Sequence, residues 1–202
     1  WRDASLAARI SYRVERHPMT ILTGYFPIFF LSLTLLPFLR NPARHWDSLL
    51  VLLGHGTLIA ALWVLGGFDV AFFVVLLPVT IASAIGSYLF YAQHSFEDMR
   101  VLPSETWTAR RASMESSSFM KLNKVMSWFT GNIGYHHIHH LNVRIPFYRL
   151  PEAMKTIPEL QSPETTTLSF KDIRACFQCC LWDEGLKRMV SYREIARATQ
   201  GA

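Results

Sequence analysis

The sequence has few cysteines, and their positions exclude a disulfide framework. It contains three, Cys176, Cys179 and Cys180, and an odd number confined to five residues does not cross-link a secreted domain. The C-x-x-C spacing of Cys176 and Cys179 has no second pair that would complete a zinc site. We therefore expect a reducing compartment, and thiols that pack as small apolar groups on an amphipathic helix.

Charged residues are also scarce, at 17% of the chain, and no stripe of Lys and Arg with interleaved aromatic residues is present. This pattern is not typical of a nucleic-acid-binding protein. The net charge is nevertheless +5. Basic loops beside apolar segments are typical of the cytoplasmic side of membrane proteins, where they also attract anionic lipid. We predict that the chain contacts membrane lipid and no nucleic acid.

Hydrophobic residues make up half of the chain, and the long apolar runs fall within the first 92 positions. The runs at 48–67 and 68–92 are each long enough to cross a bilayer, which takes about 20 residues. A third run at 18–39 contains Gly24, Pro27 and Pro37, and we predict a re-entrant or interfacial segment that breaks midway. The turn at 66–69 lacks Lys and Arg, whereas the segments that flank the apolar runs carry them. The positive-inside rule places those basic segments in the cytoplasm.

We therefore predict an all-α protein in which integral membrane helices, residues 1–92, precede a cytosolic helical cap, residues 93–202. Within the cap we expect helices at 104–130 and at about 169–198, and no strand. The chain begins with Trp1 rather than Met, and no signal peptide precedes the first apolar run. We expect it to be a fragment of a longer protein.

Four of the eight histidines fall within residues 136–140. On a helix, residues at i, i+3 and i+4 share one face, so His136, His139 and His140 converge. His137 points about 100° away. Neutral imidazole is a common ligand of iron, zinc, copper and nickel, and clustered imidazoles without a metal repel one another once protonated. We predict a transition-metal site; the alternative is a solvated polar helix with incidental histidines.

His94 follows the third apolar run and is predicted to lie at the membrane surface, at the same depth as the histidine helix. Imidazoles that bind metal usually donate their other N–H to a carboxylate or carbonyl. Gln93, Glu97 and Asp98 are therefore candidates for supporting His94. Another histidine, His55, lies inside an apolar run between two glycines, and for it we favour close helix packing over a ligand role.

Two strings of sequence resemble a known family. GNIGYHHIHHLNVRIPFYRLPE, residues 131–152, resembles the last histidine box of membrane fatty acid desaturases, in their bacterial acyl-lipid branch. FYAQHSFED, residues 90–98, resembles the Q-H-x-F-E element that precedes this box. The similarity extends from about residue 8 to residue 198 and includes LWDEGLKRM near the end.

The resemblance implies a non-haem centre of two iron ions at the cytoplasmic face of the bacterial inner membrane. Its reaction uses O₂ as co-substrate, takes electrons from a ferredoxin-like carrier, and inserts a cis double bond into a fatty acyl lipid. His136, His139 and His140 match the last box, and His94 matches an additional ligand. Asn132 and Asn142 are nearby polar residues that are candidates for supporting the ligands.

The sequence departs from the family pattern in one respect. Family members have two earlier boxes, of the types H-x-x-x-H and H-x-x-H-H, and nothing before residue 94 has that spacing. Four histidines do not complete a di-iron centre, so we expect the chain alone to be inactive. Two alternatives stay open: a histidine-box hydroxylase or carotenoid-type oxygenase, and a non-catalytic zinc-binding membrane protein with four histidine ligands.

Overall fold

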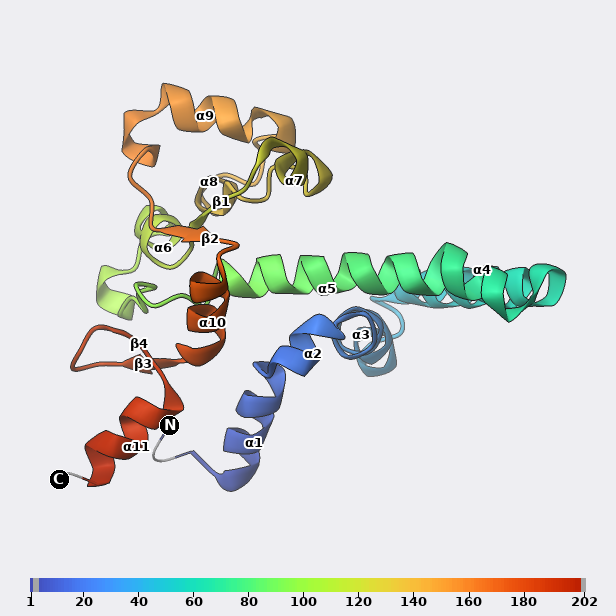
Figure 1. Ribbon diagram of the computed structural model, residues 1–202, viewed down its shortest axis with the longest axis horizontal. Helices are drawn as coiled ribbons and strands as arrows, with labels where there is room; N and C mark the ends of the chain where they lie inside the picture. The colour runs from blue at the N-terminus through green and yellow to red at the C-terminus, as the bar shows by residue number, and fades with distance from the viewer. Residues whose placement is uncertain (2–3, 201–202) are drawn as a thin grey trace. The chain divides into compact units, whose positions relative to one another are not determined.

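A computed structural model describes residue 1 and residues 4–200, with side chains through residue 197 (Figure 1). Helices dominate, which confirms the predicted all-α class. The chain divides into two compact units. We call residues 5–88 the apolar unit, and residues 1–4 together with 89–202 the polar unit.

The apolar unit begins with a short amphipathic helix and a broken apolar segment. Helix α1, Leu6–Glu15, starts at Ser5, whose hydroxyl accepts a hydrogen bond from the amide of Ala8. There follow α2 (Pro18–Leu22), the π-helix η1 (Tyr25–Leu35) and α3 (Leu36–Arg40). Together η1 and α3 measure about 24 Å at 1.5 Å per residue, which is shorter than a hydrocarbon core of about 30 Å.

The predicted break in this segment occurs at Thr23 and Gly24, a turn between α2 and η1. Pro27, the other candidate for the break, lies inside η1. The hydroxyl of Ser32 donates to the carbonyl of Pro27 at 2.8 Å, and that of Thr34 to the carbonyl of Phe29 at 2.7 Å. Each hydroxyl lies five residues after the carbonyl that it bonds, which is the spacing of the π-helix itself.

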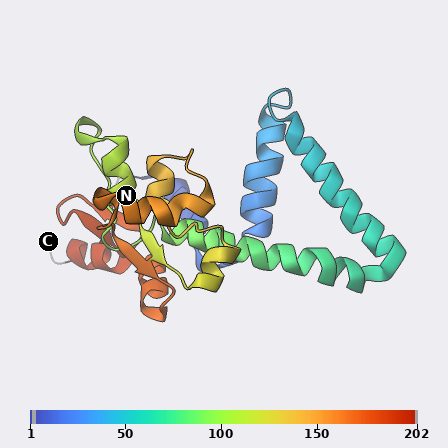
Figure 2. The same ribbon diagram turned by 90° about the horizontal axis from the view of Figure 1, so that it is seen from above.

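The remaining apolar helices are α4 (Trp46–Ala71), the π-helix η2 (Phe72–Leu76) and α5 (Leu77–Ala92). They form one apolar stretch of 47 residues, Trp46–Ala92, the one helix in the described chain that is long and apolar enough to cross a membrane. At 1.5 Å per residue it measures about 70 Å, more than twice the core of a bilayer. Gly67 interrupts it with φ 85° and ψ 171°, a left-handed conformation that favours glycine. Figure 2 shows the chain bending near the C-terminal end of α4.

Two contacts join the start of η1 to other helices of the apolar unit, one to α5 and one to α4. A side chain at Gly24 would overlap the hydroxyl of Ser87, so glycine permits a close approach there. The hydroxyl of Tyr25 and Nε2 of His55 are hydrogen-bonded at 2.5 Å. The expected close packing around His55 is wrong, because a Cβ added at Gly54 or Gly56 would meet nothing within 4 Å.

The polar unit contains short helices and two small sheets. Its elements are η3 (Ser104–Thr106), α6 (Ala109–Glu115), β1 (Phe119–Lys121), α7 (Lys124–Phe129), α8 (His136–Leu141), η4 (Phe147–Arg149), α9 (Leu150–Thr156), η5 (Pro158–Leu160), β2 (Thr165–Thr167), α10 (Phe170–Gln178), β3 (Leu181–Asp183), β4 (Arg188–Val190) and α11 (Tyr192–Gln200). Strand β1 pairs with β2 in parallel, and β3 pairs with β4 antiparallel.

The predicted helix at 104–130 is wrong, because three consecutive serines end α6. Ser116 donates from its side chain to the carbonyl of Arg100, and Ser117 donates to the carbonyl of Ser113. Side-chain bonds of serine to backbone carbonyls compete with helix continuation. The chain then enters β1, with Phe119 opposite Thr165, a partner that helix periodicity could not reveal.

The predicted helix at 169–198 is also wrong, because it ends at Gln178 and a hairpin follows. The side chain of Asp183 accepts hydrogen bonds from the amides of Gly185 and Leu186 and thereby closes the turn. Lys187 adopts φ 51° there. The expectation of no strand is also wrong, because β3 and β4 form this hairpin and β1 pairs with β2.

The cysteines pack on an amphipathic helix as predicted only at Cys176, because α10 ends at Gln178 and Cys179 and Cys180 follow it. Cys176 and Cys180 are buried, and none of the three is in a disulfide. Burial raises the pKa of the Cys176 thiol to about 12 and that of Cys179 to about 11. Both thiols therefore stay protonated at neutral pH, which suits packing rather than metal binding.

Candidate metal centre

The histidine helix α8 is positioned by a buried core on one side and a tight turn before it. Ile138 is fully buried with Leu150 and Leu160, so the helix is fixed between α6 and α9. Before it, Gly131 and Asn132 both adopt positive φ, 58° and 56°, and reverse the chain after α7. A Cβ at Gly134 would lie 2.5 Å from the carbonyl oxygen of Met120, so only glycine fits beside β1.

Three imidazoles converge beside one face of this helix. The Nε2 atoms of His94 and His136 are 2.8 Å apart, and Nε2 of His140 is 3.0 Å from each of them. His94 comes from the end of the segment that contains α5, and the other two come from successive turns of α8. These three residues form the group in the described chain that could hold a metal ion.

The geometry of the three nitrogens fits a shared cation. Each Nε2 carries either a proton or a lone pair, so at least two of the three are alike and repel each other at 3.0 Å or less. A cation removes this conflict, because all three can then present lone pairs. Nitrogens bound about 2.1 Å from one ion are ~3.0 Å apart at right angles and ~3.4 Å apart at the tetrahedral angle. The observed spacing therefore matches three adjacent positions of an octahedron.

The tautomer of His94 is also the one that a metal requires. Its Nδ1 lies 3.2 Å from the carbonyl oxygen of Ser116, which can only accept, so Nδ1 carries the proton and Nε2 keeps its lone pair. This is the usual support of a metal-binding imidazole. Nδ1 of His136 is buried without a partner among the described residues, so that ring is oriented by packing instead.

The imidazoles of this cluster favour the neutral, metal-binding form. Burial, and then the neighbouring imidazoles, lower the pKa of His136 to about 3. Burial followed by the same kind of repulsion lowers the pKa of His140. Burial lowers the pKa of His94 as well, although the hydrogen bond to Ser116 opposes this effect. All three are therefore unprotonated at neutral pH and available as ligands.

The other two histidines of the box have different positions. The ring centroid of His139 is 5.9 Å from those of both His136 and His140, so it lies beside the cluster without joining its three nitrogens. His137 is fully buried, and its Nε2 lies 3.3 Å from the carbonyl oxygen of Leu160. Burial lowers the pKa of His137 to about 4. His137 thus faces η5, away from the cluster, as the helix periodicity predicts.

Comparison with known proteins shows what kind of chain carries this cluster. The family described as "Fatty acid desaturase" matches residues 2–170. A fatty acid desaturase of Bacillus subtilis (strain 168) is 37% identical to this chain over 199 residues. The chain belongs to the fatty acid desaturase family. The alignment covers 96% of the chain and 55% of that relative, so the chain spans about half of the relative's length.

Family membership confirms the resemblance drawn from the histidine box, but the supporting residues differ from those predicted. The partner of His94 is the carbonyl of Ser116, not a neighbouring carboxylate. Glu97 lies 3.7 Å from Arg188 instead, and Asp98 is exposed. Gln93 is fully buried and donates to the carbonyl of Leu89. A carbonyl that is distant in sequence leaves no signature in the residue types, so the role of Ser116 could not be predicted.

The two predicted asparagines position the ends of the box rather than its ligands. Asn132 donates from its side chain to the carbonyl of Phe147 at 3.1 Å, which ties the turn before α8 to the segment after it. Asn142 ends α8, and its side chain accepts from the amide of Arg144 at 3.0 Å. Both therefore hold the desaturase box in place without touching a histidine in the described contacts.

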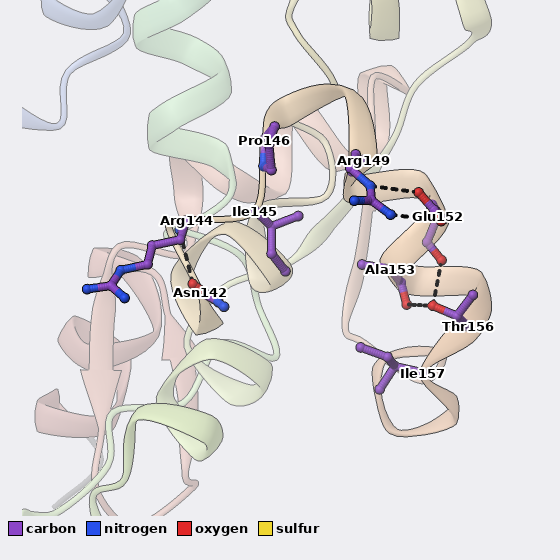
Figure 3. A pocket seen from close by; sticks show the side chains of 9 residues that line it. All are labelled: Asn142, Arg144, Ile145, Pro146, Arg149, Glu152, Ala153, Thr156 and Ile157. Atoms are coloured by element: carbon purple, nitrogen blue, oxygen red, sulfur yellow. Dashed lines mark hydrogen bonds and ion pairs between the residues drawn. The ribbon is translucent and has the colours of Figure 1, made fainter.

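A hollow of about 310 Å³ lies beyond the C-terminal end of α8 and contains no histidine in its lining (Figure 3). Two arginines line it, but they do not converge. Arg149 is paired with Glu152 at 3.0 Å, and Figure 3 shows Arg144 extending away from that pair. The hollow therefore lacks the focused positive charge that an anion site requires.

Proposed function

We propose that this chain carries part of the di-iron centre of a membrane-bound desaturase that inserts a cis double bond into a fatty acyl lipid. The observation that carries the proposal is the set of three Nε2 atoms within 3.0 Å of one another in a member of the fatty acid desaturase family. In such enzymes the bound irons supply the O₂-dependent oxidation that removes two hydrogens from adjacent CH₂ groups.

The residues of the chain have separate roles in this proposal. His94, His136 and His140 hold one iron through their Nε2 atoms, and His139, at the edge of the cluster, is a ligand of the second. Ser116 fixes the tautomer of His94 through its carbonyl. The buried side of α8, centred on Ile138, keeps the box rigid. Electrons come from a ferredoxin-like carrier, and O₂ is the co-substrate.

Four histidines leave coordination positions open on two iron ions, because an octahedral pair needs more ligands than they provide. We therefore propose that desaturation requires further ligands from outside these four residues, and that the chain alone does not desaturate. Supplying the two earlier histidine boxes should complete the site.

We also propose that the centre lies at the cytoplasmic face of the bacterial inner membrane. In this arrangement 48–67 and 68–92 are two spans that reverse at Gly67, and 18–39 lies within or along the interface. The left-handed break at Gly67 and the short length of the η1–α3 segment support the arrangement. The basic residues that flank the apolar runs favour the same orientation.

The test combines metal analysis with product analysis of the protein joined to the two earlier boxes. We expect two irons per protein, O₂ consumption with reduced ferredoxin, and cis double bonds in extracted lipids. Hydroxylated lipids would indicate the hydroxylase alternative. Bound zinc without iron, and no O₂ consumption, would indicate a zinc-binding protein and would overturn the proposal.

A further inference from the structure

The polar unit exposes large apolar side chains on two neighbouring elements. On α7, Val125, Trp128 and Phe129 are 63%, 76% and 72% exposed. On η4, Phe147 and Tyr148 are 60% and 66% exposed. We call these five residues the aromatic surface. Single exposed apolar residues are ordinary, but a group of this kind marks an interaction site.

The two parts of the aromatic surface belong together. The side chain of Asn132, just after α7, donates to the carbonyl of Phe147, and the ring of Phe147 lies over Gly131, 3.5 Å from where a Cβ would stand. The rings of Trp128 and Phe129 are 4.9 Å apart, and those of Phe147 and Tyr148 are 5.5 Å apart. The turn at Gly131 therefore places Phe147 beside the residues that directly follow α7, and we treat the exposed rings on α7 and η4 as one patch.

The charges around the aromatic surface are mostly positive. Residues 121–152 contain four cations and one carboxylate. The cations are Lys121, Lys124, Arg144 and Arg149, and the carboxylate, Glu152, is already paired with Arg149. A patch of Trp, Tyr and Phe with a basic rim matches an anionic bilayer surface, where aromatic rings occupy the headgroup level and cations meet lipid phosphates.

The aromatic surface also flanks the histidine box in sequence. Helix α7 ends at Phe129, α8 covers His136–Leu141, and η4 begins at Phe147. A hollow of about 320 Å³ beside α7 is lined by Lys124, Trp128, Asn132 and Tyr135 among others, and Tyr135 directly precedes His136. Whatever covers the aromatic surface therefore lies next to the element that carries the metal ligands.

We propose that the aromatic surface inserts into the headgroup region of an anionic bilayer and holds the histidine box against the lipid. This goes beyond the proposed function, because the contact requires neither metal nor turnover. Its occupant is a lipid surface, since the patch combines aromatic anchors with Lys121, Lys124 and Arg144, cations that form no ion pair within the described part of the chain.

The test measures where the aromatic surface lies in the whole chain reconstituted in vesicles of phosphatidylglycerol and phosphatidylcholine. Phe129→Cys is labelled with bimane at neutral pH, where the native thiols at Cys176 and Cys179 remain protonated and react slowly, and Cys180 is buried. Leu186→Cys is the matched control, because Leu186 is 60% exposed in the β3–β4 turn, away from α7 in both views of the polar unit (Figures 1 and 2). Tyr148→Cys is the second variant if Phe129→Cys does not fold.

We expect quenching by doxyl-labelled lipid to be several-fold stronger at position 129 or 148 than at 186, and quenching by aqueous iodide to be several-fold weaker. Iodide quenching at position 129 or 148 that equals the quenching at position 186 would overturn the proposal, because the aromatic surface would then face water. Protection from both quenchers would also overturn it, because protein rather than lipid would cover the surface. Lipid quenching in a chain that, once joined to the two earlier histidine boxes, binds no iron and makes no double bonds would support this proposal and overturn the proposed function.

Discussion

The apolar and polar units hold their histidines in different ways. In the apolar unit, His55 contacts Tyr25 through one hydrogen bond, and the glycines on either side of it face open space. In the polar unit, α8 is fixed by a buried residue, Ile138, and by a glycine that admits no side chain, Gly134. A precise cluster of three nitrogens thus occurs where the surrounding packing is tight, which is what a metal site needs in order to keep its ligands in register.

The largest effect should come from the cluster itself. We expect His136→Ala to weaken metal binding by more than about 100-fold, since even the loss of an outer partner costs 10–100-fold. Removing this Nε2 leaves two nitrogens and a gap in the triangle. The measurement is a titration of the metal-free protein with Co(II), followed by its visible absorption. His55→Ala is the control and should retain the affinity of the unaltered chain; a similar loss would contradict the difference between the units.

A matched pair of glycine substitutions compares the packing of the two units directly. Gly134→Ala places a Cβ 2.5 Å from the carbonyl of Met120 and should destabilise the protein by roughly 1–3 kcal/mol, as overpacking does. Gly54→Ala meets nothing within 4 Å and should stabilise its helix by up to about 1 kcal/mol. Thermal unfolding in detergent, monitored by circular dichroism, measures both. Equal shifts of the two midpoints would show that packing does not distinguish the units.

His137→Ala sharpens the distinction within α8. The substitution removes a buried imidazole and its contact with the carbonyl of Leu160, and it should cost roughly 1–3 kcal/mol of unfolding free energy. Metal affinity should change much less than in His136→Ala, because His137 faces away from the cluster. Chemical denaturation and the same Co(II) titration provide the two readouts. An equal loss of metal in both variants would refute the assignment of opposite faces.

The smallest effect should come from the exposed end of the polar unit. The pKa of Glu194 is lowered to about 2 by the amide of Ser191, the guanidinium of Arg188 and the hydroxyl of Ser191. A lowered pKa in the folded state means that this group stabilises the fold above its ordinary value of 4.5, and that the contribution is lost as the pH falls towards 2. Glu194→Gln should reduce the loss of stability between these pH values. If the unfolding free energy of Glu194→Gln depended on pH as that of the unaltered chain does, water would screen the Glu194–Arg188 ion pair completely.

Two kinds of residue explain how far prediction from the sequence extends. The positions of His136, His139 and His140 on one helix follow from a repeat of 3.6 residues, and the cluster does include His136 and His140. The helices at 104–130 and 169–198 were wrong, because Ser116–Ser118 and the Asp183 turn redirect the chain through hydrogen bonds. The Asp183 turn is local, but the bond from Ser116 to Arg100 and the pairing of Phe119 with Thr165 join residues that become neighbours only when the chain is folded.

By itself, the sequence determined the helical class, the long apolar stretch, the histidine box and the family to which it belongs. These features follow from local periodicity and from residue types, which are properties of short segments. The sequence also predicted His94 as a ligand, but only the tertiary structure decided that it, and not His139, forms the triangle with His136 and His140 and that the carbonyl of Ser116 orients it. The contacts of His94 with Ser116, His136 and His140 join residues at least 22 positions apart, and the distance between such residues depends on how the whole chain packs.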